Sequence, residues 1–77
     1  MTDNLKMIEE AVNDAVGREI EVSAESHLID DEILDSLDSA VFLLNVEKAT
    51  GMKLPETEID THDLFRVSNL LTYLDRG

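Results

Sequence analysis

The feature that most limits how this chain can fold is an apolar stretch that begins behind a polar, acidic entry and ends at a glycine. Asp35 and Ser36 stand directly before the stretch, and Gly51 follows it. Small polar side chains satisfy the free amides at a helix start, and glycine readily takes the left-handed conformation that ends one. These signals predict a helix over residues 37–50. The helix is apolar on more than one side, so we expect part of it to face outward in so small a domain.

Two further helices are predicted from apolar residues that recur at spacings of three and four, over residues 3–16 and residues 67–75. A short helical turn is expected over residues 61–65, with Thr61 as its cap. Together these elements predict an all-α fold, a small four-helix bundle with three main helices and a short third helix. Residues 1–77 are expected to form a single domain.

A long connection, residues 18–35, separates the first two helices. Structureless loops of this length are unusual in compact domains, so side chains are expected to hold it against the helices. Five apolar residues are the candidates for this role: Ile20, Val22, Leu28, Ile33 and Leu34. Leu64 and Phe65 are likewise expected to pack inward.

Composition narrows the classes of function. The formal net charge is −12, cysteine is absent, and 12 of the 18 acidic residues lie within residues 1–38. Such a field repels nucleic acid and anionic lipid, and it attracts basic protein surfaces. The apolar runs are far shorter than the roughly 20 residues of a membrane span, and no secretory signal is visible. We expect a monomeric, cytoplasmic protein that neither binds nucleic acid nor inserts into membranes.

One possible role for Ser36 is that of a hydrolase nucleophile. That chemistry needs a base and an oxyanion hole, but His27 and His62 lie far off in sequence and no glycine-rich turn surrounds the serine. Both histidines are therefore expected at the surface or in loops. The neighbouring acids lack the spacing and the glycine of a calcium loop, so no dedicated metal site is predicted. Two roles remain open for Ser36: a plain helix cap, or a hydroxyl that carries a phosphodiester at a helix start.

The stretch Asp35-Ser36-Leu37-Asp38 resembles the signature of acyl and peptidyl carrier proteins. Leu28-Ile29-Asp30-Asp31 is similar to that family's approach to the serine, and Gly51-Met52-Lys53-Leu54-Pro55 is similar to its link after the second helix. The order of helices and loops also agrees with the family. The resemblance therefore covers nearly the whole chain.

This resemblance implies a free-standing, non-catalytic carrier. Ser36 would receive 4'-phosphopantetheine from coenzyme A through a phosphopantetheinyl transferase, and the thiol of that group would hold an acyl, aminoacyl or polyketide-type cargo as a thioester. Loading and transfer enzymes for that cargo are the other implied partners. Five residues are the expected recognition residues: Asp35, Leu37, Asp38, Val41 and Leu44.

The chain also departs from the family's pattern. Glu32-Ile33-Leu34 stands where many fatty-acid carriers have a glycine, and Val41 and Lys48 stand where those carriers usually have acids. We therefore expect partners to dock on Leu37, Val41 and Leu44 mainly through apolar contact, with the upstream acids steering the encounter. The alternative from another class is an acidic helical adaptor that binds a partner through the same stripe and carries no cargo.

Overall fold

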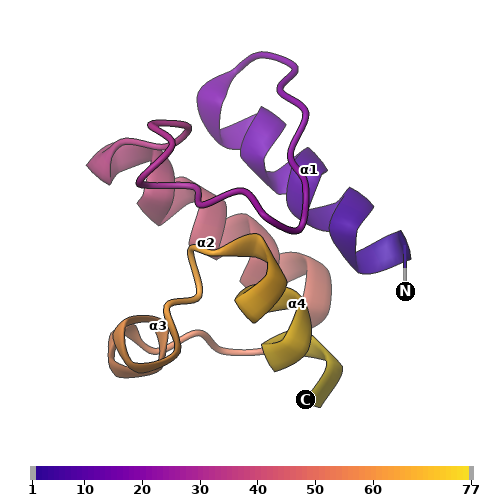
Figure 1. The fold of residues 1–77 in the computed structure, drawn as a ribbon, viewed down its shortest axis with the longest axis vertical. Coiled ribbons are helices and arrows are strands. Elements are labelled where there is room, and N and C mark those ends of the chain that lie inside the picture. The colour runs from indigo at the N-terminus through magenta and orange to yellow at the C-terminus, as the bar shows by residue number, and fades with distance from the viewer. Residues whose placement is uncertain (1, 77) are drawn as a thin grey trace.

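A computed structural model describes residues 2–76, and within them the chain forms four helices and no strand (Figure 1). Its helices, in chain order, are α1 (Thr2–Val16), α2 (Ser36–Thr50), α3 (Glu56–His62) and α4 (Val67–Arg76). The predictions of helices over residues 3–16, 37–50 and 67–75 are confirmed. None of the four described helices has the length and apolarity needed to cross a bilayer.

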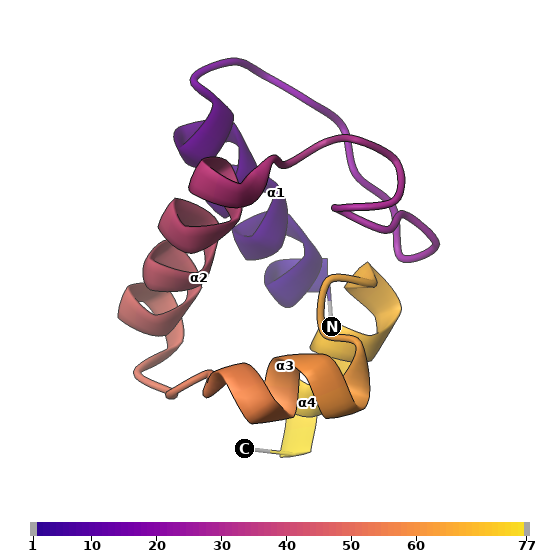
Figure 2. The same ribbon diagram turned by 90° about the vertical axis from the view of Figure 1, so that its left-hand side faces the viewer.

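The core lies between α1 and α2 and is closed by the two shorter helices. Figure 2 shows α1 and α2 side by side, with α3 crossing at the end where α2 finishes. Ile8 and Val12 of α1 are fully buried, as are Phe42 and Val46 of α2. The remaining buried apolar side chains are one further residue of α1 and residues of the connections, α3 and α4: Ala11, Val22, Leu28, Leu34, Leu54, Ile59, Leu64, Val67, Leu70 and Leu74.

Both ends of α2 follow from local backbone chemistry. The Asp35 carboxylate caps the helix by accepting a hydrogen bond from the Asp38 amide, with an N···O distance of 2.8 Å. At the other end, Gly51 adopts φ 72° and donates its amide to the carbonyl of Glu47. The sequence left Asp35 and Ser36 as alternative caps. Asp35 takes that role, and Ser36 becomes the first residue of the helix.

The long connection is held against the helices as predicted, and polar contacts add to the apolar ones. Val22, Leu28 and Leu34 are buried, while Ile20 and Ile33 are half-buried against the core. Two side chains of α1 also bind the loop backbone, although the helical pattern assigns both to the solvent side. Asn13 Oδ1 accepts the Ile20 amide at 2.7 Å, and Glu9 Oε2 accepts the Val22 amide at 3.2 Å.

The predicted position of the short helix was wrong. It spans Glu56–His62 and not residues 61–65, and Thr61 lies inside it. Pro55 begins the helix, since its carbonyl accepts the amides of Glu58 and Ile59 at 3.0 Å each. Acidic residues in the first turn favour this start because they face the positive end of the helix dipole.

The helix ends where Asp63 takes a left-handed conformation at φ 49°. The chain then turns inward, and Leu64 is 1% exposed while Phe65 is half-buried. The inward packing expected of these two residues is therefore confirmed, although they lie after the helix and not in it.

His27 lies in the connection, as expected of a loop residue, but it is buried at 8% exposure. Its Nε2 lies 2.8 Å from Asp63 Oδ1, and its backbone forms an antiparallel bridge with Arg66. Its Nδ1 accepts the amides of Ile29 and Asp30. Because Nδ1 accepts, the proton of the neutral ring sits on Nε2 and is donated to Asp63. The imidazole thus ties the long connection to the end of α3.

Candidate functional site

Ser36 is an exposed residue at the first position of α2. Its carbonyl accepts a hydrogen bond from the Ser39 hydroxyl at 2.9 Å, which ties that end of the backbone to the first helical turn. Within residues 2–76, the Ser36 hydroxyl itself makes no hydrogen bond to another residue. A hydroxyl in this position is accessible to a reagent or enzyme that approaches the start of α2.

Two carboxylates stand on either side of this hydroxyl in the sequence. Asp35 is exposed and is fixed by its hydrogen bond to the Asp38 amide, and Asp38 is half-buried in the first turn. The helix dipole stabilises negatively charged groups at the N-terminal end of a helix. The described residues contain no cluster of ligands positioned for a metal ion. The two acids present negative charge to a molecule that approaches the start of α2.

An exposed apolar strip continues along α2 from this end. Leu37 is 74% exposed, Val41 38% and Leu44 51%, and these three residues, called the outward strip below, follow one another at helical spacings. Phe42 and Val46 of the same helix are fully buried. The apolar residues on one side of α2 therefore pack in the core, and those of the outward strip face the solvent. Exposed apolar side chains gathered on one face are typical of a binding surface.

Ile29 belongs to the exposed apolar residues as well, at 36% exposure. The sequence predicts no recognition role for its side chain. The residues beside it, Leu28 and Asp30, do not show that Ile29 is exposed while other apolar residues of the connection are buried. It lies in the connection that precedes α2.

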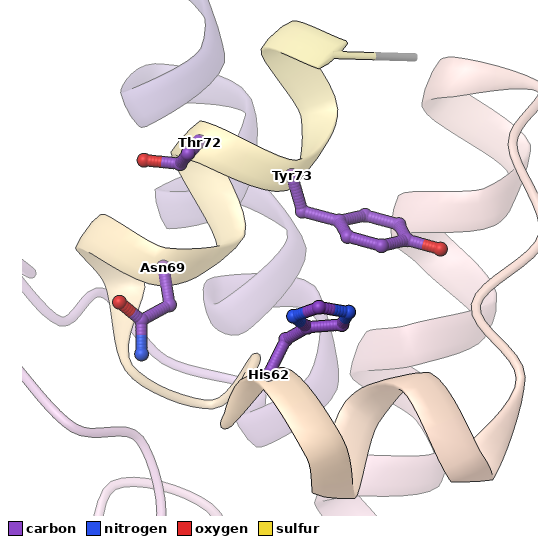
Figure 3. A pocket seen from close by; sticks show the side chains of 4 residues that line it. All are labelled: His62, Asn69, Thr72 and Tyr73. Carbon is purple, nitrogen blue, oxygen red and sulfur yellow. The ribbon is translucent and has the colours of Figure 1, made fainter.

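A separate hollow lies between α3 and α4 (Figure 3). His62 and Tyr73 face each other across it, with ring centroids 5.8 Å apart, and the hollow has a volume of about 150 Å³. Asn69 and Thr72 complete the lining, and each donates a hydrogen bond to a backbone carbonyl nearby. The hollow contains no serine, and the Thr72 hydroxyl in its lining donates to the Ser68 carbonyl and not to His62.

Neither histidine reaches the serine that the sequence analysis singled out. His27 is bound to Asp63 and to loop amides, and His62 Nε2 lies 3.6 Å from Glu58 Oε1. No hydrogen bond links a histidine to Ser36 among residues 2–76. The side chains that a serine hydrolase needs are therefore not assembled in the described part of the chain.

The site thus consists of an exposed serine at a helix start, two flanking aspartates and the outward strip of Leu37, Val41 and Leu44. Each of the predicted site residues lies on α2 or is its cap. One helix therefore presents all of them together. Comparison with known proteins gave no match to this chain, whether to a family model, a curated protein or a solved structure.

Proposed function

We propose that this chain is a carrier protein of the acyl and peptidyl carrier type, with Ser36 as the attachment point of 4'-phosphopantetheine. The observation that carries the proposal is the exposed hydroxyl of Ser36 at the start of α2, next to an exposed apolar strip on the same helix. In this function the chain is a substrate of enzymes and performs no catalysis itself. When bound, the group supplies a thiol that holds an acyl, aminoacyl or polyketide-type cargo as a thioester.

The residues around Ser36 fit a phosphodiester. The first amides of a helix lack intrahelical partners and stabilise an anion there. The Asp38 amide is occupied by Asp35, while the amides of Ser36 and Leu37 precede it in the first turn. Because the serine is exposed, a phosphodiester on its oxygen stays in water and costs no burial of charge.

Attachment transfers a phosphoryl group, with its pantetheine arm, from the pyrophosphate of coenzyme A to the serine hydroxyl, which gives a phosphodiester. Ser36 Oγ attacks the phosphorus that bears the pantetheine arm in coenzyme A, and a new Oγ–P bond forms. The bond from that phosphorus to the bridging oxygen of the pyrophosphate breaks. Adenosine 3',5'-bisphosphate leaves with the electron pair, and the hydroxyl proton passes to a base of the transferase. No oxidant or reductant is needed.

The partner surfaces follow from the same helix. Asp35 and Asp38 present negative charge beside the reacting oxygen, and the outward strip offers apolar contact to the transferase and to loading enzymes. Opposite charges raise the rate of encounter, whereas buried apolar area provides most of the affinity. We therefore assign recognition to Asp35, Leu37, Asp38, Val41 and Leu44.

The proposal is tested by incubating the purified chain with coenzyme A and a phosphopantetheinyl transferase of broad specificity, followed by intact-protein mass spectrometry. We expect a mass gain of one phosphopantetheine group, located by fragmentation on Ser36. Ser36→Ala is expected to abolish the gain. Ser39→Ala, one helical turn away, is the matched control and is expected to retain it. No gain in the unmodified chain, or a gain that persists in Ser36→Ala, contradicts the assignment.

A second function is favoured by the exposure of Leu37 and Leu44. An acidic adaptor would place this strip in an apolar groove of a partner and would carry no cargo. Such an adaptor needs the strip but not the Ser36 hydroxyl. It would therefore tolerate Ser36→Ala in a binding assay, whereas a carrier loses all loading with that substitution.

A further inference from the structure

The buried imidazole of His27 uses both of its ring nitrogens in hydrogen bonds. Its Nδ1 lies 3.3 Å from the amide nitrogen of Ile29 and 3.0 Å from that of Asp30, and its Nε2 lies 2.8 Å from Asp63 Oδ1. Backbone amides only donate, so Nδ1 must offer a lone pair to both of them. The geometry therefore fits the neutral ring, with its single proton on Nε2.

A second proton on this ring has only one nitrogen left to bind. Because Nε2 is already protonated, the proton must go to Nδ1, which then becomes a donor that faces two other donors. The bonds to the amides of Ile29 and Asp30 are lost together. The bond from Nε2 to Asp63 becomes charge-assisted and stronger. Protonation thus releases the ring from its own loop and tightens its bond to the end of α3.

The charged groups around the ring come from the connection and from the segment between α3 and α4. Besides Asp63, Asp30 Oδ2 lies 3.8 Å from Nδ1, and Asp31 Oδ2 accepts the backbone amide of His27 at 3.0 Å. Arg66, whose backbone forms a bridge with His27, places its Nε 3.9 Å from Asp63 Oδ2. Three carboxylates and one guanidinium thus surround the site. On balance they attract a charged imidazole, so the ring can take up a proton within the fold.

We propose that residues 27–31 form a pH-dependent switch with two hydrogen-bonding arrangements. At neutral pH, Nδ1 of His27 accepts the amides of Ile29 and Asp30. Once Nδ1 is protonated, these amides separate from the ring, and the Asp30 carboxylate turns inward to accept the new N–H. That side chain is 74% exposed and free to turn, and its Oδ2 is already 3.8 Å from Nδ1. Histidine ordinarily changes its charge between about pH 5 and pH 8, so mild acid operates the switch.

The rearrangement is confined to one turn of the connection. Leu28 is fully buried, its amide donates to the Phe65 carbonyl at 2.8 Å, and its carbonyl accepts the Leu34 amide at 2.8 Å. None of these contacts involves a titratable group, so they hold in both arrangements. What changes is the surface ahead of Ser36, from which the charge of Asp30 is withdrawn. The switch does not depend on the proposed function, but in a carrier it lowers the negative charge that a basic partner meets.

The unmodified chain, labelled with ¹⁵N, tests the proposal by NMR from about pH 7.5 to about pH 5, a range in which histidine ordinarily titrates. Long-range ¹H–¹⁵N spectra of the His27 ring are expected to show a proton on Nε2 alone at the upper pH and on both nitrogens at the lower pH. The amide signals of Ile29 and Asp30 are expected to shift with the same midpoint as the ring. The protection of the Asp30 amide against hydrogen exchange is expected to fall at least about fivefold, whereas that of Leu34 is retained.

Three results of this titration overturn the proposal. One is a proton on Nδ1 at the upper pH, because Nδ1 could not then accept the two amides. Another is protonation of the ring while the signals of Ile29 and Asp30 stay unmoved. The third is an equal loss of protection at Leu34, which would mean that the whole connection opens. Because no arm is attached, each result is independent of whether Ser36 can be modified.

Variants then assign the transition to its two side chains. His27→Gln is expected to abolish the pH-dependent shift of the Ile29 amide, and His62→Gln, at the other histidine, is expected to retain it. Asp30→Ala removes the acceptor of the new N–H and is expected to move the midpoint to lower pH by more than Glu32→Ala, which removes the same charge two residues away. A shift that persists in His27→Gln, or equal midpoints in the two acid variants, contradicts the proposal. If His27→Gln does not fold, the ring spectra of the unmodified chain decide.

Discussion

At the scale of single residues, His27 holds the long connection to the end of α3. A histidine in a polar, acidic loop is usually exposed, yet this imidazole is buried and uses both ring nitrogens. Its partner Asp63 is 36 residues away. Sequence patterns report neighbours within a helix or turn, so they cannot reveal a contact made across the fold. The same reason explains why the helical pattern of α1 gives no sign that Glu9 and Asn13 bind the loop backbone.

Removing this imidazole is expected to destabilise the domain. His27→Ala removes a buried imidazole and its three hydrogen bonds, to the amides of Ile29 and Asp30 and to the Asp63 carboxylate, and each such bond contributes about 0.5–1.5 kcal/mol. Urea unfolding followed by circular dichroism measures the change. We expect a lower midpoint at nearly constant slope, because the surface exposed on unfolding stays the same.

His62→Ala is the matched control for that measurement. His62 has a 44% exposed side chain, its contact with Glu58 spans 3.6 Å, and its ring lies near that of Tyr73, so its loss is expected to lower the free energy of unfolding by about 1 kcal/mol or less. An equal effect of the two substitutions would contradict the role given to His27.

Among the helices, α2 has one face that packs in the core and another that is exposed. Phe42 and Val46 anchor it in the core, whereas the outward strip of Leu37, Val41 and Leu44 remains exposed. This division was predictable, since a 77-residue chain has too little mass to enclose an apolar helix on every side. The strip is where partner recognition is expected to be decided.

Val41→Glu places a charge in the middle of the outward strip. If partners bury this strip, the carboxylate must lose water on docking, and kcat/KM of the phosphopantetheinyl transferase is expected to fall about tenfold or more. Steady-state kinetics with the variant as substrate measure the effect. Thr57→Glu adds the same charge at an exposed position of α3 and is expected to keep the original rate. Unchanged kinetics for Val41→Glu would refute apolar docking on this strip.

Three of the four described helices could be predicted from the sequence, whereas the position of α3 could not. α1, α2 and α4 were found because each has apolar residues at helical spacing, and because glycine or a capping acid marks the ends of α2. The seven-residue α3 contributes a single buried apolar residue, Ile59, so it has no stripe to detect. Its signals were Pro55 and the two glutamates of its first turn, which together mark a helix start.

At the scale of the whole molecule, negative charge and the exposed apolar strip act together. Twelve of 18 acids fall within residues 1–38, the segment that leads to the start of α2. A field of this sign accelerates encounter with basic partner surfaces, and it disfavours nucleic acid. The fold holds Ser36 at the exposed end of α2 and leaves the outward strip open beside it. The proposed carrier function requires both features at once, whereas an adaptor requires only the strip.

The most direct test of the central claim is the mass of the chain as its own cells make it. The protein is purified from its native host without added cofactor, digested, and the peptide that contains Ser36 is analysed by mass spectrometry. A carrier is expected to show 4'-phosphopantetheine on Ser36, with or without a thioester-bound cargo. An unmodified Ser36 in cells with an active phosphopantetheinyl transferase would contradict the carrier function and favour the adaptor.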